Sequence, residues 1–157
     1  MAIADMFLKL TGVTGEAQDN EHKGEIQVVS WSWGLQAPAA MGGAASTTGR
    51  AALQELVVVK RVDQATPTLM QLVRQHKVVP SAQLTVRKAG TTPLEYFRIE
   101  LTNVRVTALT THSEAAELVE RLQLGCTKVR VTYMPQSATG ARGGGDVVFE
   151  ADAYAGS

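Results

Sequence analysis

Residues 53–62 (LQELVVVKRV) constrain the fold most, because they place apolar side chains at both odd and even positions. In a strand, successive side chains point to opposite faces of the sheet. A strand that is apolar on both faces needs cover on both sides. We therefore expect one face of this segment to lie in a barrel interior and the other against a helix or a second subunit.

Most of the remaining segments are also typical of strands, since they are rich in β-branched and aromatic residues. They are residues 3–10, 25–35, 82–88, 94–109 and 125–134. The buried positions of residues 94–109 change parity along the segment, which predicts a bulge near Thr102 and Asn103.

The two-residue period of residues 25–35 separates large apolar side chains from small ones. One face carries Val29, Trp31, Trp33 and Leu35, and the other carries Ser30, Ser32 and Gly34. Two tryptophans on one face are more typical of a core than of a ligand platform. The small polar face is expected to line a water-filled channel or to face bulk solvent.

One helix is predicted, over residues 66–77. Thr66 can cap it, Pro67 suits the first turn, and an apolar stripe follows. The stripe consists of Leu69, Met70, Leu72 and Val73. Residues 114–124 (EAAELVERLQL) are ambiguous, because their propensities favour a helix while the following segment is typical of a strand.

Length and charge limit the function classes. The 157 residues suit a single domain, residues 1–157, and its 15 basic and 15 acidic side chains cancel. A nucleic-acid partner is not expected, because such proteins need clustered excess lysine and arginine. No apolar run approaches the ~20 residues of a membrane helix, and the first residues do not resemble a signal peptide. We expect a protein made in the cytoplasm and not inserted into a membrane.

No catalytic site, metal site or cofactor is expected. Cys126 is the sole cysteine, and His22, His76 and His112 fall in a predicted surface loop, at a helix end and at a strand end. Cys126 with one of these histidines would make a hydrolase, but no surrounding motif supports that pairing. The glycine clusters at 42–43 and 143–145 lack the lysine and helix of a phosphate loop.

Two segments have neither strand nor helix spacing. Residues 36–52 form a long stretch of small residues, which indicates either a docking arm or a simple hairpin loop. Residues 137–157 form a glycine-containing tail, and its short apolar piece Val147-Val148-Phe149 predicts either a mobile end or a last edge strand.

The chain resembles the haemolysin-coregulated protein (Hcp) family of type VI secretion systems over roughly residues 5–136. The shared residues include Asp5-Met6-Phe7, Gly12-Val13, Gly15-Glu16, Ser30-Trp31-Ser32-Trp33-Gly34, Asp63, Thr66-Pro67-Thr68-Leu69-Met70, Leu84-Thr85-Val86-Arg87-Lys88-Ala89-Gly90 and Pro135-Gln136. Cys126 stands where the family usually has a large aromatic residue, and the tail after Gly145 matches poorly.

The resemblance implies a mainly β fold, a two-sheet β-barrel with one flanking helix, in which residues 114–134 form one long strand. It implies a structural tube subunit rather than an enzyme. Six copies would form a ring, and the rings would stack into a hollow tube. The implied partners are other copies of the chain, a spike protein at the tube tip, a contractile sheath and secreted effector proteins. The protein would leave the cell without a signal peptide.

The resemblance also implies functional positions. Ser32 matches a lumen-facing position, so Ser32 and Ser30 on the same face are expected to contact effectors. The loop within residues 36–52 is expected to dock against the next ring through Ala40, Met41, Gly42, Gly43, Thr47 and Arg50. A monomeric β-barrel that binds a small ligand and a tail-tube protein of a contractile phage remain as alternatives.

Overall fold

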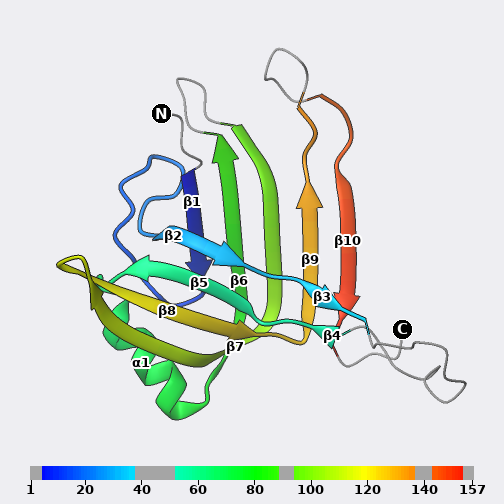
Figure 1. Ribbon diagram of the computed structural model, residues 1–157. Helices are drawn as coiled ribbons and strands as arrows, with labels where there is room; N and C mark the ends of the chain where they lie inside the picture. The colour runs from blue at the N-terminus through cyan, green and yellow to red at the C-terminus, as the bar shows by residue number, and fades with distance from the viewer. Residues whose placement is uncertain (1–4, 38–51, 89–93, 137–142, 154–157) are drawn as a thin grey trace, which may run out of the picture.

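A computed structural model describes residues 5–37, 52–88, 94–136 and 143–153 (Figure 1). Within these ranges the chain forms strands and one helix. The strands are β1 (Asp5–Leu10), β2 (Ile26–Ser32), β3 (Leu35–Gln36), β4 (Ala52–Leu53), β5 (Leu56–Arg61), β6 (Val78–Lys88), β7 (Leu94–Glu114), β8 (Glu117–Gly125), β9 (Lys128–Tyr133) and β10 (Val147–Asp152), and the helix is α1 (Thr66–Gln75).

Six of the strands close into a barrel. They follow the order β7, β6, β1, β2, β5 and β8, and β8 returns to pair with β7. Strands β9 and β10 continue the sheet outwards from β7, while β3 and β4 pair separately. Figure 1 shows β1 and β6 crossing β5 and β8 at a steep angle, with α1 beside the barrel. The predicted two-sheet barrel with one flanking helix is therefore confirmed.

Strand β7 takes part in both layers of the barrel. One of its edges pairs with β6 from Leu94 to Arg105. Its other edge pairs with β9 over residues 97–102 and then with β8 over residues 105–114. The change of partner near Asn103 closes the barrel through β8 and leaves β9 outside it.

The bulge predicted near Thr102 and Asn103 is wrong. Leu101 and Val104 are both buried, so the inward-facing positions do change parity. The pairing of β7 with β6 does not shift there, because both strands change parity together. The corresponding buried residues of β6 are Val79 and Ala82. Asn103 has a φ of 52°, so the two strands bend as a pair through its left-handed backbone.

A true bulge lies four residues further along β7, at Thr107. The register with β8 shifts between Val106 and Ala108, which leaves Thr107 as an additional residue. Its hydroxyl donates to Glu55 Oε1 at 2.8 Å.

The bulge in β2 changes the face predicted for its first residues. The register with β5 shifts between Val28 and Ser30, and Val29 is 42% exposed. Trp31 packs against the core, whereas Leu35 in β3 is largely exposed. Val29 therefore does not share the buried face of Trp31, because the shift reverses the alternation before Trp31. Leu35 has the same parity as Trp31 but lies in β3, outside the barrel sheet.

Residues 114–124 form a hairpin strand rather than a helix. β8 pairs with β7 and β5, and its Leu122 and Leu124 lie in the core. The single strand expected over residues 114–134 is wrong as well. The chain leaves the sheet at Cys126 and Thr127, and β9 then pairs with the first half of β7.

Helix α1 ends earlier than predicted and is not capped by Thr66. The N-cap residue is Ala65, which makes no side-chain capping bond, while Pro67 lies in the first turn. The backbone N–H of Ala65 donates to Asp63 Oδ1 at 3.0 Å. The helix stops at Gln75 because His76 has a left-handed backbone, with a φ of 53°.

A buried ion pair joins β5 to β8 next to the first residue of α1. Lys60 and Glu120 lie directly opposite in register, their side chains are fully buried, and Nζ is 2.5 Å from Oε2. Thr66 donates to Glu120 Oε2 at 2.6 Å and Thr111 donates to Oε1 at 3.0 Å. Asp63 Oδ1 lies 2.9 Å from Lys60 Nζ. Each buried charge therefore has partners, as burial requires.

The connection between β1 and β2 folds back over the barrel end. His22 is 5% exposed, its Nδ1 lies 3.0 Å from Glu25 Oε2, and its Nε2 lies 3.2 Å from Glu95 Oε2. Its ring stacks on Phe7, with the centroids 4.5 Å apart. The sequence predicted a surface histidine here, and this was wrong because ring stacking and two carboxylates bury it.

Arg87 on β6 holds the same connection. Its guanidinium donates to both carboxylate oxygens of Asp19 and lies 5.0 Å from the centroid of the Phe7 ring. The hydrogen bonds from Arg87 lower the pKa of Asp19 to about 2, because they favour the charged carboxylate.

The β7–β8 hairpin ends in a two-residue turn without glycine. Glu114 and Glu117 pair across it, and Ala115 and Ala116 have φ values of 50° and 66°. Such a turn favours Asn-Gly, since both central residues need positive φ. A Cβ in the left-handed region costs about 1–2 kcal/mol per residue. The exposed Ala-Ala turn is therefore strained.

We expect Ala115→Asn/Ala116→Gly to raise the free energy of unfolding by about 1–2 kcal/mol, because it removes this backbone strain. Urea denaturation measures the change. The converse control is Gly24→Ala, since Gly24 has a φ of 80° and open space around its Cα. That control should lower the free energy of unfolding by about 1 kcal/mol. Equal stability of the Asn-Gly variant and the parent protein would contradict the strain.

Lys60→Met is expected to lower the free energy of unfolding by about 3–5 kcal/mol, because it leaves Glu120 buried without its cation. The double variant Lys60→Met/Glu120→Leu should be much more stable than this single variant, since no charge is then buried alone. Arg61→Met is the matched control: Arg61 makes an exposed pair with Glu117 at 3.5 Å. Its loss should cost less than about 1 kcal/mol in the same urea titration. A double variant as unstable as Lys60→Met would show that the lone charge is not the cause.

Candidate functional site

Strands β9 and β10 form a sheet extension that lies outside the closed barrel. β9 pairs with β7, and β10 pairs with β9 along its whole length, from Val147 opposite Tyr133 to Asp152 opposite Lys128. Figure 1 shows the two strands standing beside β7, away from α1. Among the described strands, only the first half of β7 pairs with this sheet extension, over residues 97–102.

One face of the sheet extension is apolar and continues the core face of β7. Near the barrel this face is covered, since Ile99 and Val129 are both 0% exposed. Further out it is bare: Tyr133 is 47%, Phe149 41% and Val147 62% exposed. The apolar face of the sheet is therefore longer than the part of it that the rest of the chain covers.

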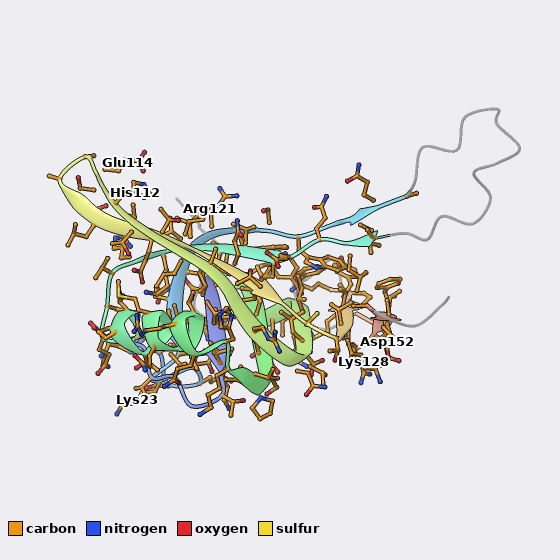
Figure 2. All side chains as sticks on the ribbon, turned by 90° about the horizontal axis from the view of Figure 1, so that it is seen from below. Lys23, His112, Glu114, Arg121, Lys128 and Asp152 are labelled. Carbon is orange, nitrogen blue, oxygen red and sulfur yellow. The ribbon has the colours of Figure 1, made fainter. Side chains whose placement is uncertain are left out.

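The opposite face carries alternating charges. Glu150, Arg130 and Glu100 lie directly opposite one another across β10, β9 and β7. Asp152 lies opposite Lys128 in the same way, at the end of the sheet extension (Figure 2). Opposite charges at paired positions favour this register. This side of the sheet extension is thus mainly polar, with the exposed Val148 as its apolar residue, while the other side is apolar.

The outer edge of β10 is open in the described part of the chain, because β10 is the last strand in the sheet order. Its sequence, VVFEAD, contains neither proline nor lysine. Edge strands that avoid pairing often carry such residues, and the two charged residues of β10, Glu150 and Asp152, both lie on one face of the strand. An open edge beside a bare apolar face can accept a strand or a sheet face of another polypeptide.

Ser30 and Ser32 lie on the barrel wall and not on the sheet extension. Both are exposed, and they pair with half-buried valines on the outer face of β5. Trp31 points the other way and stacks on Phe97, with the ring centroids 5.6 Å apart. The predicted small polar face at these two serines is therefore present.

The six loop residues predicted to dock between rings lie outside the described residues. They are Ala40, Met41, Gly42, Gly43, Thr47 and Arg50. The paired strands β3 and β4 bring the two ends of that loop side by side.

A cavity of about 530 Å³ lies between β4 and the two residues after it, the middle of β7, and the connection from β8 to β9. Its lining includes Leu53, Glu55, Val78, Arg105, Cys126 and Ala153. Burial raises the pKa of the Cys126 thiol, which disfavours the thiolate that a nucleophile needs.

Within the described residues, Cys126 has no histidine as a hydrogen-bond partner. His22 is held by Glu25 and Glu95, His76 ends α1, and His112 lies near the tip of the β7–β8 hairpin (Figure 2). Among the hydrogen bonds of the described residues, none joins a histidine to Cys126, and these residues contain no cluster of three or more potential metal ligands.

Sequence reasoning missed the sheet extension as a surface. The apolar run Val147-Val148-Phe149 between polar segments was a signal, but it could not show which face stays bare. It also missed the buried pair of Lys60 and Glu120, whose signal was a charged residue inside each of two apolar strands.

A family model described as "Type VI secretion system effector, Hcp" matches residues 7–133. The chain belongs to the Hcp family. Protein hcp1 of Pseudomonas aeruginosa is 39% identical over an alignment of 149 residues, and the match covers 92% of each chain. The resemblance predicted from the sequence is therefore confirmed.

Solved Hcp structures share the fold. Hcp1 from Salmonella typhimurium is 30% identical, with a TM-score of 0.78 over 100% of this chain and 99% of that one. A type VI secretion system effector from Yersinia pestis is 28% identical, with a TM-score of 0.78 over 94% and 99%. The described part of this Hcp protein contains no helix long and apolar enough to cross a bilayer.

Proposed function

We propose that this Hcp protein is a structural subunit of the type VI secretion tube, which assembles into hexameric rings that stack into a hollow tube. The main support is the sheet extension, because in a single copy its apolar face is exposed and the outer edge of β10 has no partner strand in the described residues. In such a ring, the surface that covers the extension would come from a different part of the next copy. Such head-to-tail contacts close into a ring when the rotation between copies permits it.

The remaining partners of the proposal follow from family membership. The tube would carry a spike protein at its tip, a contractile sheath around it and effector proteins inside it, and it would be exported through the secretion system. The role is structural rather than enzymatic. Cys126 has no histidine as a hydrogen-bond partner within the described residues, which supports this part of the proposal.

The lumen would be lined by the outer face of β2 and β5, where Ser30 and Ser32 are exposed. Small hydroxyl side chains leave room for a folded effector and offer it hydrogen bonds. Stacking of rings would use the loop between β3 and β4.

We expect rings of six copies for the purified protein in sedimentation experiments and negative-stain images. Phe149→Glu and Val147→Asp should weaken association at least about tenfold, because each places a charge on the apolar face of the sheet extension. Fully burying a side chain of this kind is worth about 1.5–3 kcal/mol.

Met70→Glu is the matched control, since Met70 on α1 is 48% exposed, similar to Phe149, but lies away from the sheet extension. It should leave association unchanged. A parent protein that stays monomeric across the micromolar range would overturn the tube proposal and would favour the monomeric ligand-binding barrel. Rings that are unaffected by both charged variants would remove the sheet extension from the contact.

Ser32→Arg is expected to leave the rings intact and to reduce the amount of effector that copurifies with them, because a long charged side chain then occupies the lumen. Quantitative mass spectrometry of rings coexpressed with the effectors of the same secretion system measures the ratio. Lys9→Trp on the exposed face of β1 is the control for an unrelated bulky change. Unchanged effector retention in Ser32→Arg would place the effector contact elsewhere.

A further inference from the structure

The β7–β8 hairpin projects away from the barrel. Figure 2 shows it reaching one end of the molecule, with His112 and Glu114 near its tip. Every residue from 112 to 118 is exposed, and Leu118 is 58% exposed. The hairpin tip, residues 113–118, therefore presents its side chains outwards.

The sequence of the turn at this tip is not one that stabilises a two-residue hairpin turn. Ala115 and Ala116 hold left-handed conformations that Asn-Gly would adopt without strain. Strained backbone conformations cluster at functional positions such as ligand contacts and switch regions. Two alanines make the turn itself narrow and apolar, so its backbone can approach a partner closely.

The cavity described above lies at the other end of the molecule. Its lining residues Thr127 and Ala153 adjoin Lys128 and Asp152, which Figure 2 shows opposite the end that carries Glu114. Leu53, Val78 and Ala153 give it apolar walls. Its volume of about 530 Å³ falls within the range of about 300–1,000 Å³ typical of ligand pockets. It can therefore take a two-residue turn with small side chains.

The two ends offer one complementary pair of charges, although the cavity also holds the carboxylate of Glu55. Arg105 at the cavity is exposed and has no hydrogen bond or ion pair within the described ranges, whereas the nearby Glu55 accepts from Thr107 at 2.8 Å. At the tip, Glu114 is likewise without a described partner, and Glu117 lies 3.5 Å from Arg61. The free guanidinium and the free carboxylate therefore suit one another.

We propose that the Ala115–Ala116 turn of one copy docks in the cavity of the next copy, with Glu114 beside Arg105. The occupant is a second copy of this chain, because the tip and the cavity differ and lie at opposite ends. The contact then repeats from copy to copy, as a ring or a stack requires. This inference rests on the proposed tube function and names a contact through which the copies would join.

Cys126 offers a test, because it lines the cavity and is the sole cysteine of the sequence. Ala116→Cys adds a thiol at the tip of every copy. Treatment with a short bis-methanethiosulfonate should then give a ladder of covalent oligomers joined between residues 116 and 126, identified by mass spectrometry. Ala116→Cys/Cys126→Ser should give no ladder, because one thiol per copy can yield dimers at most.

Gln71→Cys is the matched control, since Gln71 is an exposed residue of α1. Its ladder should form at least about tenfold more slowly than that of Ala116→Cys. Equal rates for the two variants would overturn the docked tip. Rings without an Ala116→Cys ladder would also overturn it while leaving the tube function standing. A protein that stays monomeric and gives neither rings nor ladders would contradict both the tube function and the docked tip.

A charge exchange tests the same contact without cysteine chemistry. Glu114→Arg and Arg105→Glu should each weaken association about fivefold or more, because each sets like charges against one another. The double variant should recover most of the loss. A double variant that is as weak as the single ones would show that these two residues do not meet. Circular dichroism checks that each variant is folded.

Discussion

One strand, β7, connects the two layers of this protein, and the change in its hydrogen-bonding partner determines the architecture. β6 follows one of its edges up to Arg105, while the other edge pairs first with β9 and then with β8. The bend at Asn103 and the bulge at Thr107 turn the second half of β7 away from the first. The barrel can close because β8 takes over as partner, and for the same reason β9 and β10 are left outside without a second layer. The bare apolar face is therefore a product of the sheet topology.

Much of the secondary structure could be predicted from residue spacing. Pro67 and the leucines after it predict α1. The apolar residues on both faces of β5 predicted cover on both sides, but only the face of Leu56 and Val58 is buried, while Val57 and Val59 on the other face are half-buried. Residues 114–124 could not be resolved, because helix propensity is local while the outcome depends on distant partners. Glu120 faces Lys60 across the sheet and Leu122 lies in the core, and these contacts exist only in the strand form.

The candidate surfaces were less accessible to sequence reasoning. The alternation that separates Ser32 from Trp31 is a local property, so it could be predicted. The exposure of Phe149 could not, since a pattern of apolar residues does not say whether another layer covers them. The bend at Asn103 could not be predicted for a similar reason. When the inward-facing positions of one strand change from odd to even, the sequence suggests a bulge, unless the partner strand is known to change in the same way.

The open edge of β10 has a consequence for the life of the protein before assembly. A newly made copy exposes the edge of β10 and the apolar face of the sheet extension. Exposed strand edges and apolar surfaces promote non-specific aggregation at high protein concentration. Assembly into rings and tubes therefore competes with aggregation for the unassembled copies. A cell that makes this protein in quantity therefore benefits from holding back the pool of unassembled copies, through rapid capture or through a chaperone that shields the last strand.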